Sequence, residues 1–115
     1  MAFIIFYVTH PSEEEARRIS DSIVTARMAA CANIFPIQSA YWWEGKIENG
    51  KEWVSLLKTA PHLRSQLQEA IERLHPYEVP CIMQWEVSAN EAYENWILSS
   101  VLNKEEVNGA KGDRF

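Results

Sequence analysis

The sequence has few of the features that mark secreted or membrane-bound chains. Its only cysteines, Cys31 and Cys81, are too far apart to form a CxxC motif, and this usage fits a reducing cytosol better than a disulfide framework. The apolar run at residues 3–8 is too short to span a membrane, and no basic leader or small-residue cleavage pattern accompanies it. We therefore expect a cytoplasmic protein without a membrane partner.

Positive charge is also scarce. The chain carries 11 Lys and Arg against 16 Asp and Glu, and its net charge is -5. Nucleic acids and anionic membranes attract basic patches, and no stretch rich in Lys or Arg is present. We expect no nucleic-acid partner. The length of 115 residues fits one domain, which we assign to residues 1–102, with 103–115 as a polar, disordered tail.

Hydrophobic periodicity and capping signals predict the secondary structure. Ser12, with Glu15 three residues later, is typical of a helix start, and Asn49-Gly50 is the strongest hairpin signal. We predict strands at 3–8, 31–43, 51–59 and 79–87, helices at 12–29 and 63–74, and a short helix after Asn90. Right-handed connections fold this βαββαβ order into an α+β protein, an antiparallel sheet with both main helices on one face.

That arrangement leaves one sheet face uncovered, and the aromatic content indicates what covers it. Neighbouring residues of a strand point to opposite faces, so Trp42 and Trp43 cannot share one core. A large exposed apolar patch is unusual for a monomer. We predict that further copies of the chain cover the patch and that Tyr41, Trp42 and Trp43 lie at the interface. The alternative is that the terminal helix, with Trp96 and Ile97, covers this face within one subunit.

Four segments in register carry a specific resemblance: "MAACANI" at 28–34, "SAYWWEGKI" at 39–47, "LLKT" at 56–59 and "LHPYEVP" at 74–80. Together they resemble the CutA family of divalent-cation tolerance proteins. The resemblance implies a ferredoxin-like fold, a homotrimer assembled through the long hairpin, and a role connected with copper and other divalent ions.

Comparison with the family pattern also shows differences in this chain. Members often carry Glu where Cys81 follows the "LHPYEVP" segment. Some bind copper through a cysteine that aligns with Val8 and a double histidine that aligns with Leu74 and His75, so this sequence keeps only His75 of that ligand set. The resemblance therefore implies weak copper(II) binding in a cleft between subunits, with water or a partner's group completing the site.

The loop after the second helix holds the candidate ligands. Pro76 and Pro80 stiffen it around His75, Tyr77 and Glu78. Imidazole suits copper, nickel and zinc, and a carboxylate adds negative charge. We predict His75, Glu78 and Cys81 as metal ligands and Tyr77 as a cleft residue. The alternative is that this loop only stabilises the fold, with the phenol hydrogen-bonded.

Other polar residues have simpler interpretations. Lys58 either reaches the rim of the cleft or pairs with a carboxylate such as Glu78. Cys31 is a small thiol that packs in the core, and His10 and His62 are expected to be exposed.

Catalysis is not expected from this sequence. No nucleophile and base pair with an oxyanion loop is evident, so we predict that the protein is not an enzyme. A small-molecule sensor or scaffold that resembles the trimeric PII proteins in shape is the alternative to metal binding. However, a nucleotide sensor needs basic phosphate contacts, and the sequence has no glycine-rich loop to supply them.

Overall fold

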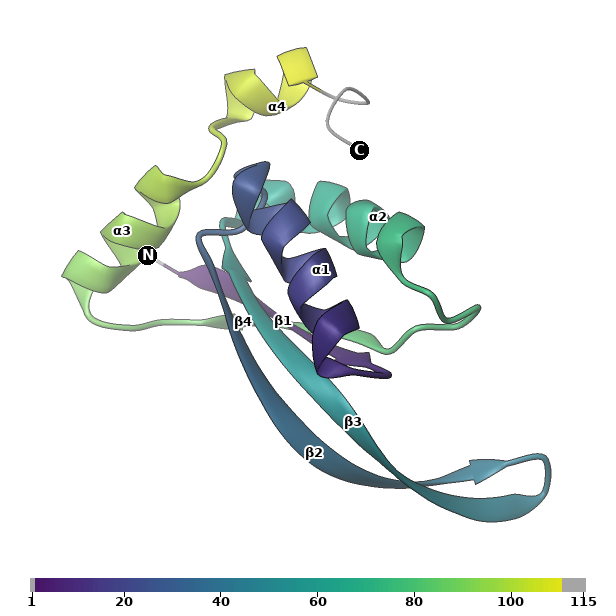
Figure 1. The fold of residues 1–115 in the computed structure, drawn as a ribbon. Coiled ribbons are helices and arrows are strands. Elements are labelled where there is room, and N and C mark those ends of the chain that lie inside the picture. Colours follow the sequence, from purple (N-terminus) through teal and green to yellow (C-terminus); the bar gives the residue numbers. More distant parts are fainter. Residues whose placement is uncertain (1, 111–115) are drawn as a thin grey trace.

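The computed structural model describes residues 2–110, in which a four-stranded antiparallel sheet supports two long helices (Figure 1). The elements, in chain order, are β1 (Phe3–His10), α1 (Glu13–Thr25), β2 (Cys31–Trp43), β3 (Lys46–Thr59), the 3₁₀ turn η1 (Pro61–Leu63), α2 (Arg64–Leu74), β4 (Ile82–Val87), α3 (Glu91–Ser100) and α4 (Lys104–Ala110). The α+β prediction is therefore confirmed. Among residues 2–110, no helix combines the length and hydropathy that crossing a membrane requires.

The strand order β2-β3-β1-β4 makes β2 and β4 the edges of the sheet. Pro36, which cannot donate a ladder hydrogen bond, is tolerated because β2 is an edge strand. β1 pairs with β3 only from Trp53 to Thr59. β2 and β3 therefore continue beyond β1 as a long two-stranded hairpin (Figure 1).

The main core lies between the sheet and α1 and α2, which cover the same face (Figure 1). Alternate residues of β1 are fully buried under these helices, namely Ile4, Phe6, Val8 and His10. Ile5 and Tyr7 point to the other face and are half-buried, so burial of β1 on both faces is incomplete within one subunit. The cap at Ser12 is confirmed, since its hydroxyl accepts a hydrogen bond from the Glu15 backbone N–H at 3.1 Å.

The predicted hairpin turn was wrong. Asn49 and Gly50 lie inside β3, paired with Ala40 and Ser39 of β2. The chain reverses instead at Glu44-Gly45, where φ is 49° and 77°. Two consecutive residues with positive φ form the tight turn whose twist matches that of the flanking strands.

Helix boundaries also differ from the prediction. α1 ends at Thr25 rather than near Ala29, because Arg27 adopts a positive φ of 61° and breaks the helical path. Asn90 does precede α3, but its side chain makes no capping hydrogen bond; the Glu94 carboxylate accepts one from the Ala89 N–H at 2.8 Å instead.

The C-terminal segment was also predicted wrongly in part. Residues 104–110, expected to be disordered, form α4, and Val107 is buried in the main core cluster. Val107 thus connects this helix of seven residues to the core. The rest of the predicted tail, 111–115, lies outside the described residues.

Candidate functional site

The loop that joins α2 to β4 passes around the end of β1, and His75 fastens it there. The imidazole Nε2 lies 2.6 Å from the carbonyl oxygen of Thr9, and the backbone N–H of Tyr77 donates to Nδ1 at 3.1 Å. Nδ1 accepts a hydrogen bond and Nε2 faces a carbonyl oxygen, so this geometry corresponds to the tautomer with hydrogen on Nε2. Both nitrogens are thus engaged, and a metal ion could bind His75 only after one of these bonds broke.

A second histidine lies beneath the first. His10 is completely buried, which corrects the expectation that it is exposed, and its ring stacks on that of His75 at 5.3 Å between centroids. Its Nε2 is 2.8 Å from the hydroxyl of Ser55, while Nδ1 has no hydrogen-bond partner in the described structure. Burial, reinforced by the neighbouring His75, lowers the pKa of His10 to about 4. His10 is therefore neutral at physiological pH.

Glu52 joins the loop to the long hairpin, and the sequence interpretation overlooked it. Its carboxylate accepts hydrogen bonds from Ser39 at 2.8 Å and from the phenol of Tyr77 at 3.3 Å. Burial and the Glu52 charge raise the pKa of Tyr77 to about 12. Ser39 lies on β2 and Glu52 on β3, thirteen residues apart in the chain. The register set by the turn at Glu44-Gly45 pairs Glu52 with Ile37 and so brings it diagonally next to Ser39.

Cys81 lies near the same carboxylate. Burial, followed by the charge of Glu52, raises the pKa of the Cys81 thiol, while a hydrogen bond with the Thr9 side chain opposes this shift. We call the group Ser39, Glu52, Tyr77 and Cys81 the Glu52 corner. Glu78, in contrast, is exposed at the tip of the loop.

The Glu52 corner lies on the face of the sheet away from α1 and α2. Glu52 alternates with Trp53, which pairs with the inward-facing His10, and therefore points outward. Outward residues of β4 include Met83 and Trp85, which are each a little under half exposed. The corner thus adjoins an apolar surface.

Lys58 lies at the opposite end of this outward face. Its ammonium donates to the phenol oxygen of Tyr93 on α3 at 3.0 Å, and the Cys31 sulfur is 3.8 Å from the same oxygen. Of the two alternatives for Lys58, pairing with a carboxylate such as Glu78 is therefore not the one found in the described structure. Lys58 and Glu52 are six positions apart on β3, or about 20 Å, so within one chain Lys58 is not part of the loop site. Cys31 is half-buried rather than fully in the core.

The helix α3 covers only this end of the outward face, where Tyr93 packs edge-on against Phe3 at 6.1 Å. The hairpin remains open: Tyr41 is 48% exposed, Trp42 73% and Trp43 61%. The helix α3 is thus only a partial cover. It does not cover this face within one subunit, as the alternative interpretation required, and it leaves the predicted interface residues accessible.

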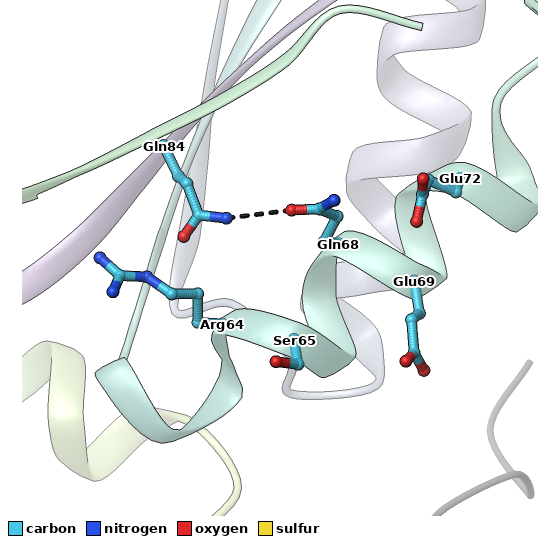
Figure 2. A pocket seen from close by; sticks show the side chains of 6 residues that line it. All are labelled: Arg64, Ser65, Gln68, Glu69, Glu72 and Gln84. Carbon is cyan, nitrogen blue, oxygen red and sulfur yellow. Dashed lines mark hydrogen bonds between the residues drawn. The ribbon is translucent and has the colours of Figure 1, made fainter. Parts of the chain in front are cut away.

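A shallow groove of about 350 Å³ lies elsewhere, between α2 and the edge strand β4. Figure 2 shows Gln84 of β4 pointing towards α2, where its amide nitrogen donates to Gln68 at 3.0 Å. The other lining residues are also polar or charged, namely Arg64, Ser65, Glu69 and Glu72. None of the predicted site residues lines this groove.

Metal-binding capacity within one chain is limited. Among the described residues, no group of three His, Cys, Asp or Glu side chains is arranged to hold a metal ion. His75, Glu78 and Cys81 therefore do not form a complete ligand set by themselves, and their assignment as ligands stays a prediction.

Comparisons with known proteins identify the relatives of this chain. Residues 4–100 match the model of the CutA1 divalent ion tolerance protein family. The "Divalent-cation tolerance protein CutA" of Thermotoga maritima is 41% identical over 100 residues, which cover 86% of this chain and 99% of that protein.

Solved structures agree with this match. The crystal structure of CutA1 from Pyrococcus horikoshii has a TM-score of 0.84 and 42% identity, covering 87% of this chain and 99% of that chain. For CutA1 from Oryza sativa the TM-score is 0.86 at 35% identity, covering 90% and 97%. The resemblance inferred from four short segments is confirmed: the chain belongs to the CutA1 divalent ion tolerance protein family.

Proposed function

We propose that the protein acts in tolerance to divalent cations as a cytoplasmic homotrimer, without enzymatic activity, and that it binds copper(II) weakly at the Glu52 corner. The observation that carries the proposal is a partial donor set beside an exposed apolar face. Glu52 and Cys81 supply a carboxylate and a thiol, and Glu78 and His75 lie on the adjoining loop. Their own chain leaves coordination positions open, which a neighbouring subunit or water would fill.

The chemistry of these groups sets how tightly a cation binds. A carboxylate, a thiolate and an imidazole together suit copper or zinc better than magnesium or calcium. His75 must first release the Tyr77 N–H or the Thr9 carbonyl, and Cys81 must lose a proton that its raised pKa retains. Both requirements reduce affinity, so we expect micromolar rather than tighter binding.

Calorimetric titration with copper(II) tests the site. Glu52→Gln keeps the shape of the side chain but removes its charge, and we expect it to weaken binding roughly tenfold, with His75→Ala weakening it further. Affinity should fall as the pH is lowered, because protons compete for the thiol and the imidazole. Glu14→Gln, on the exposed side of α1, is the matched control and should bind as the parent does. Equal affinity of all four proteins would contradict the assignment.

The alternative function is a PII-like small-molecule sensor or a scaffold without a specific metal site. Two observations favour it: both nitrogens of His75 are engaged within the fold, and the groove beside α2 is polar and open. Absence of copper(II) binding to the parent protein, together with an intact trimer, would support this alternative.

A further inference from the structure

The C-terminal segment of this chain extends beyond the residues that match the family model. The family match ends at residue 100, whereas the described structure continues through Val101, Leu102 and α4. Val101, Leu102 and Val107 are all buried, and all belong to the main core cluster. Figure 1 shows α4 beyond the ends of α1 and α2. The extension therefore contributes to the core at the end of the helical layer.

Arg27 holds the start of this extension, and its own conformation is strained. It occupies the position after α1 where helices commonly place glycine, because φ there is 61°. The Arg27 N–H donates to Val24 at 2.9 Å and that of Met28 to Ile23 at 3.0 Å, which closes the helix. A side chain at such a position costs conformational energy relative to glycine, so some other interaction of Arg27 must account for it.

Two interactions of Arg27 reach the extension. Its carbonyl accepts the N–H of Leu102 at 3.0 Å, and its Nε donates to the carbonyl of Ser100 at 3.2 Å. From the other side, the His62 ring lies 2.6 Å from the carbonyl of Leu102, so Nε2 must be the donor. Arg27, in the loop after α1, and His62, in η1, thus both hydrogen-bond to the stretch from Ser100 to Leu102.

The helix that follows, α4, begins with a capping box, but few of its side chains are buried. The Asn103 side chain accepts the N–H of Glu106 at 2.8 Å, and the Glu106 carboxylate accepts the N–H of Asn103 at 3.0 Å, a reciprocal capping box. Lys104, Glu105 and Glu106 are exposed, and Val107 is buried. A helix of seven residues is not stable in isolation, so its order depends on the docking of Val107.

We propose that residues 101–107 form a latch, clasped by Arg27 and His62, which opens and closes over the apolar core while the sheet stays folded. Closed, the latch seals the cluster that contains Met28, Leu63 and Val107. Open, it exposes apolar surface at the end of the helical layer. Segments with few buried contacts open locally at lower free energy than the core strands, and here one valine secures the far half of the latch.

Amide hydrogen exchange on the full chain tests the latch. The amides of Leu102 and Val107, which donate to Arg27 and Asn103, should exchange at least roughly tenfold faster than the paired amides of β1. Val107→Asp should accelerate exchange at Leu102 by a further tenfold or so without changing β1, because a buried carboxylate disfavours the closed state. Binding of the dye ANS should rise in parallel.

Two further variants distinguish local opening of the latch from a general loss of stability of the fold. Arg27→Gly accepts positive φ without strain but loses the bond to Ser100, so we expect faster exchange in the latch with no fall in melting temperature. Glu105→Gln, exposed on α4, should leave exchange unchanged. Latch amides that exchange at the rate of the β1 amides, or a Val107→Asp protein with unaltered exchange at Leu102, would overturn the proposal.

Discussion

His10 shows how one residue can couple stability to pH. It is fully buried at the end of β1, its Nε2 pairs with Ser55, and its Nδ1 lacks a partner. The ionisable groups that act on it are His75 and Arg18, which disfavour protonation of His10, and Glu15, which favours it. Desolvation outweighs the attraction of Glu15, and the pKa falls from 6.5 to about 4.

The lowered pKa predicts loss of stability in acid. The unfolded chain takes up a proton below about pH 6.5, whereas the folded chain resists it until about pH 4. This contribution to stability is therefore fully present above pH 6.5 and is lost as the pH falls towards 4. We expect His10 to account for about 2 kcal/mol of the change in unfolding free energy between about pH 7.5 and 4.5.

Urea denaturation of the parent and of His10→Gln, at one protein concentration, measures this contribution. The variant removes the titrating group, so its unfolding free energy should fall less over the same pH interval. Carboxylates titrate equally in both proteins, which makes the difference between the two slopes the relevant quantity. Identical slopes would show that His10 is not the group responsible.

At the scale of elements, the β2-β3 hairpin depends on two residues with positive φ. Glu44 has φ of 49° and Gly45 of 77°, and a residue with Cβ is disfavoured there. Gly50, in contrast, lies in the strand without positive φ, and a Cβ added to it would meet no atom within 4 Å. The same substitution therefore has opposite expected effects at the two glycines.

Gly45→Ala should lower the free energy of unfolding by about 1 kcal/mol, because alanine is strained at positive φ. Gly50→Ala should be neutral or raise stability by about 0.5 kcal/mol, because it reduces the freedom of the unfolded chain. Thermal denaturation of both variants checks the pair. Equal effects of the two substitutions would place the turn elsewhere.

At the scale of the whole molecule, the exposed aromatic side chains predict self-association. Tyr41 and Trp43 point to one face of the hairpin and Trp42 to the other, as strand alternation requires. Covering one tryptophan removes about 200 Å² from water, which stabilises an assembly by up to about 5 kcal/mol. Further copies of the chain that cover both faces would account for the outward aromatics.

Light scattering during size-exclusion chromatography should return three times 13.3 kDa for the parent protein. Trp42→Asp should reduce this mass, because a carboxylate buried at an interface without a partner costs several kcal/mol. Glu14→Gln serves again as the control and should keep the parent mass. A monomeric parent at micromolar concentration would contradict the trimer. A Trp42→Asp protein with the same mass as the parent would show that Trp42 does not lie at the interface.

Local patterns in the sequence determined most of the secondary structure and the family. Hydrophobic periodicity placed β1, α2 and β4, since a strand or helix that packs on a core must repeat apolar residues at its own period. The Ser12 cap was equally local. Local preference failed at the hairpin, because Asn49-Gly50 is a good turn sequence but the pairing of thirteen residues of β2 with β3 fixes the register.

The tertiary structure decided which side chains meet. Glu52 reaches Tyr77 across 25 positions and His10 meets His75 across 65, and no spacing in the sequence indicates either contact. Burial of His10, docking of Val107 and strain at Arg27 were likewise invisible, because each depends on what packs against the residue. The sequence alone identified the loop that carries the candidate ligands. Only the fold revealed that both nitrogens of His75 already hold that loop in place.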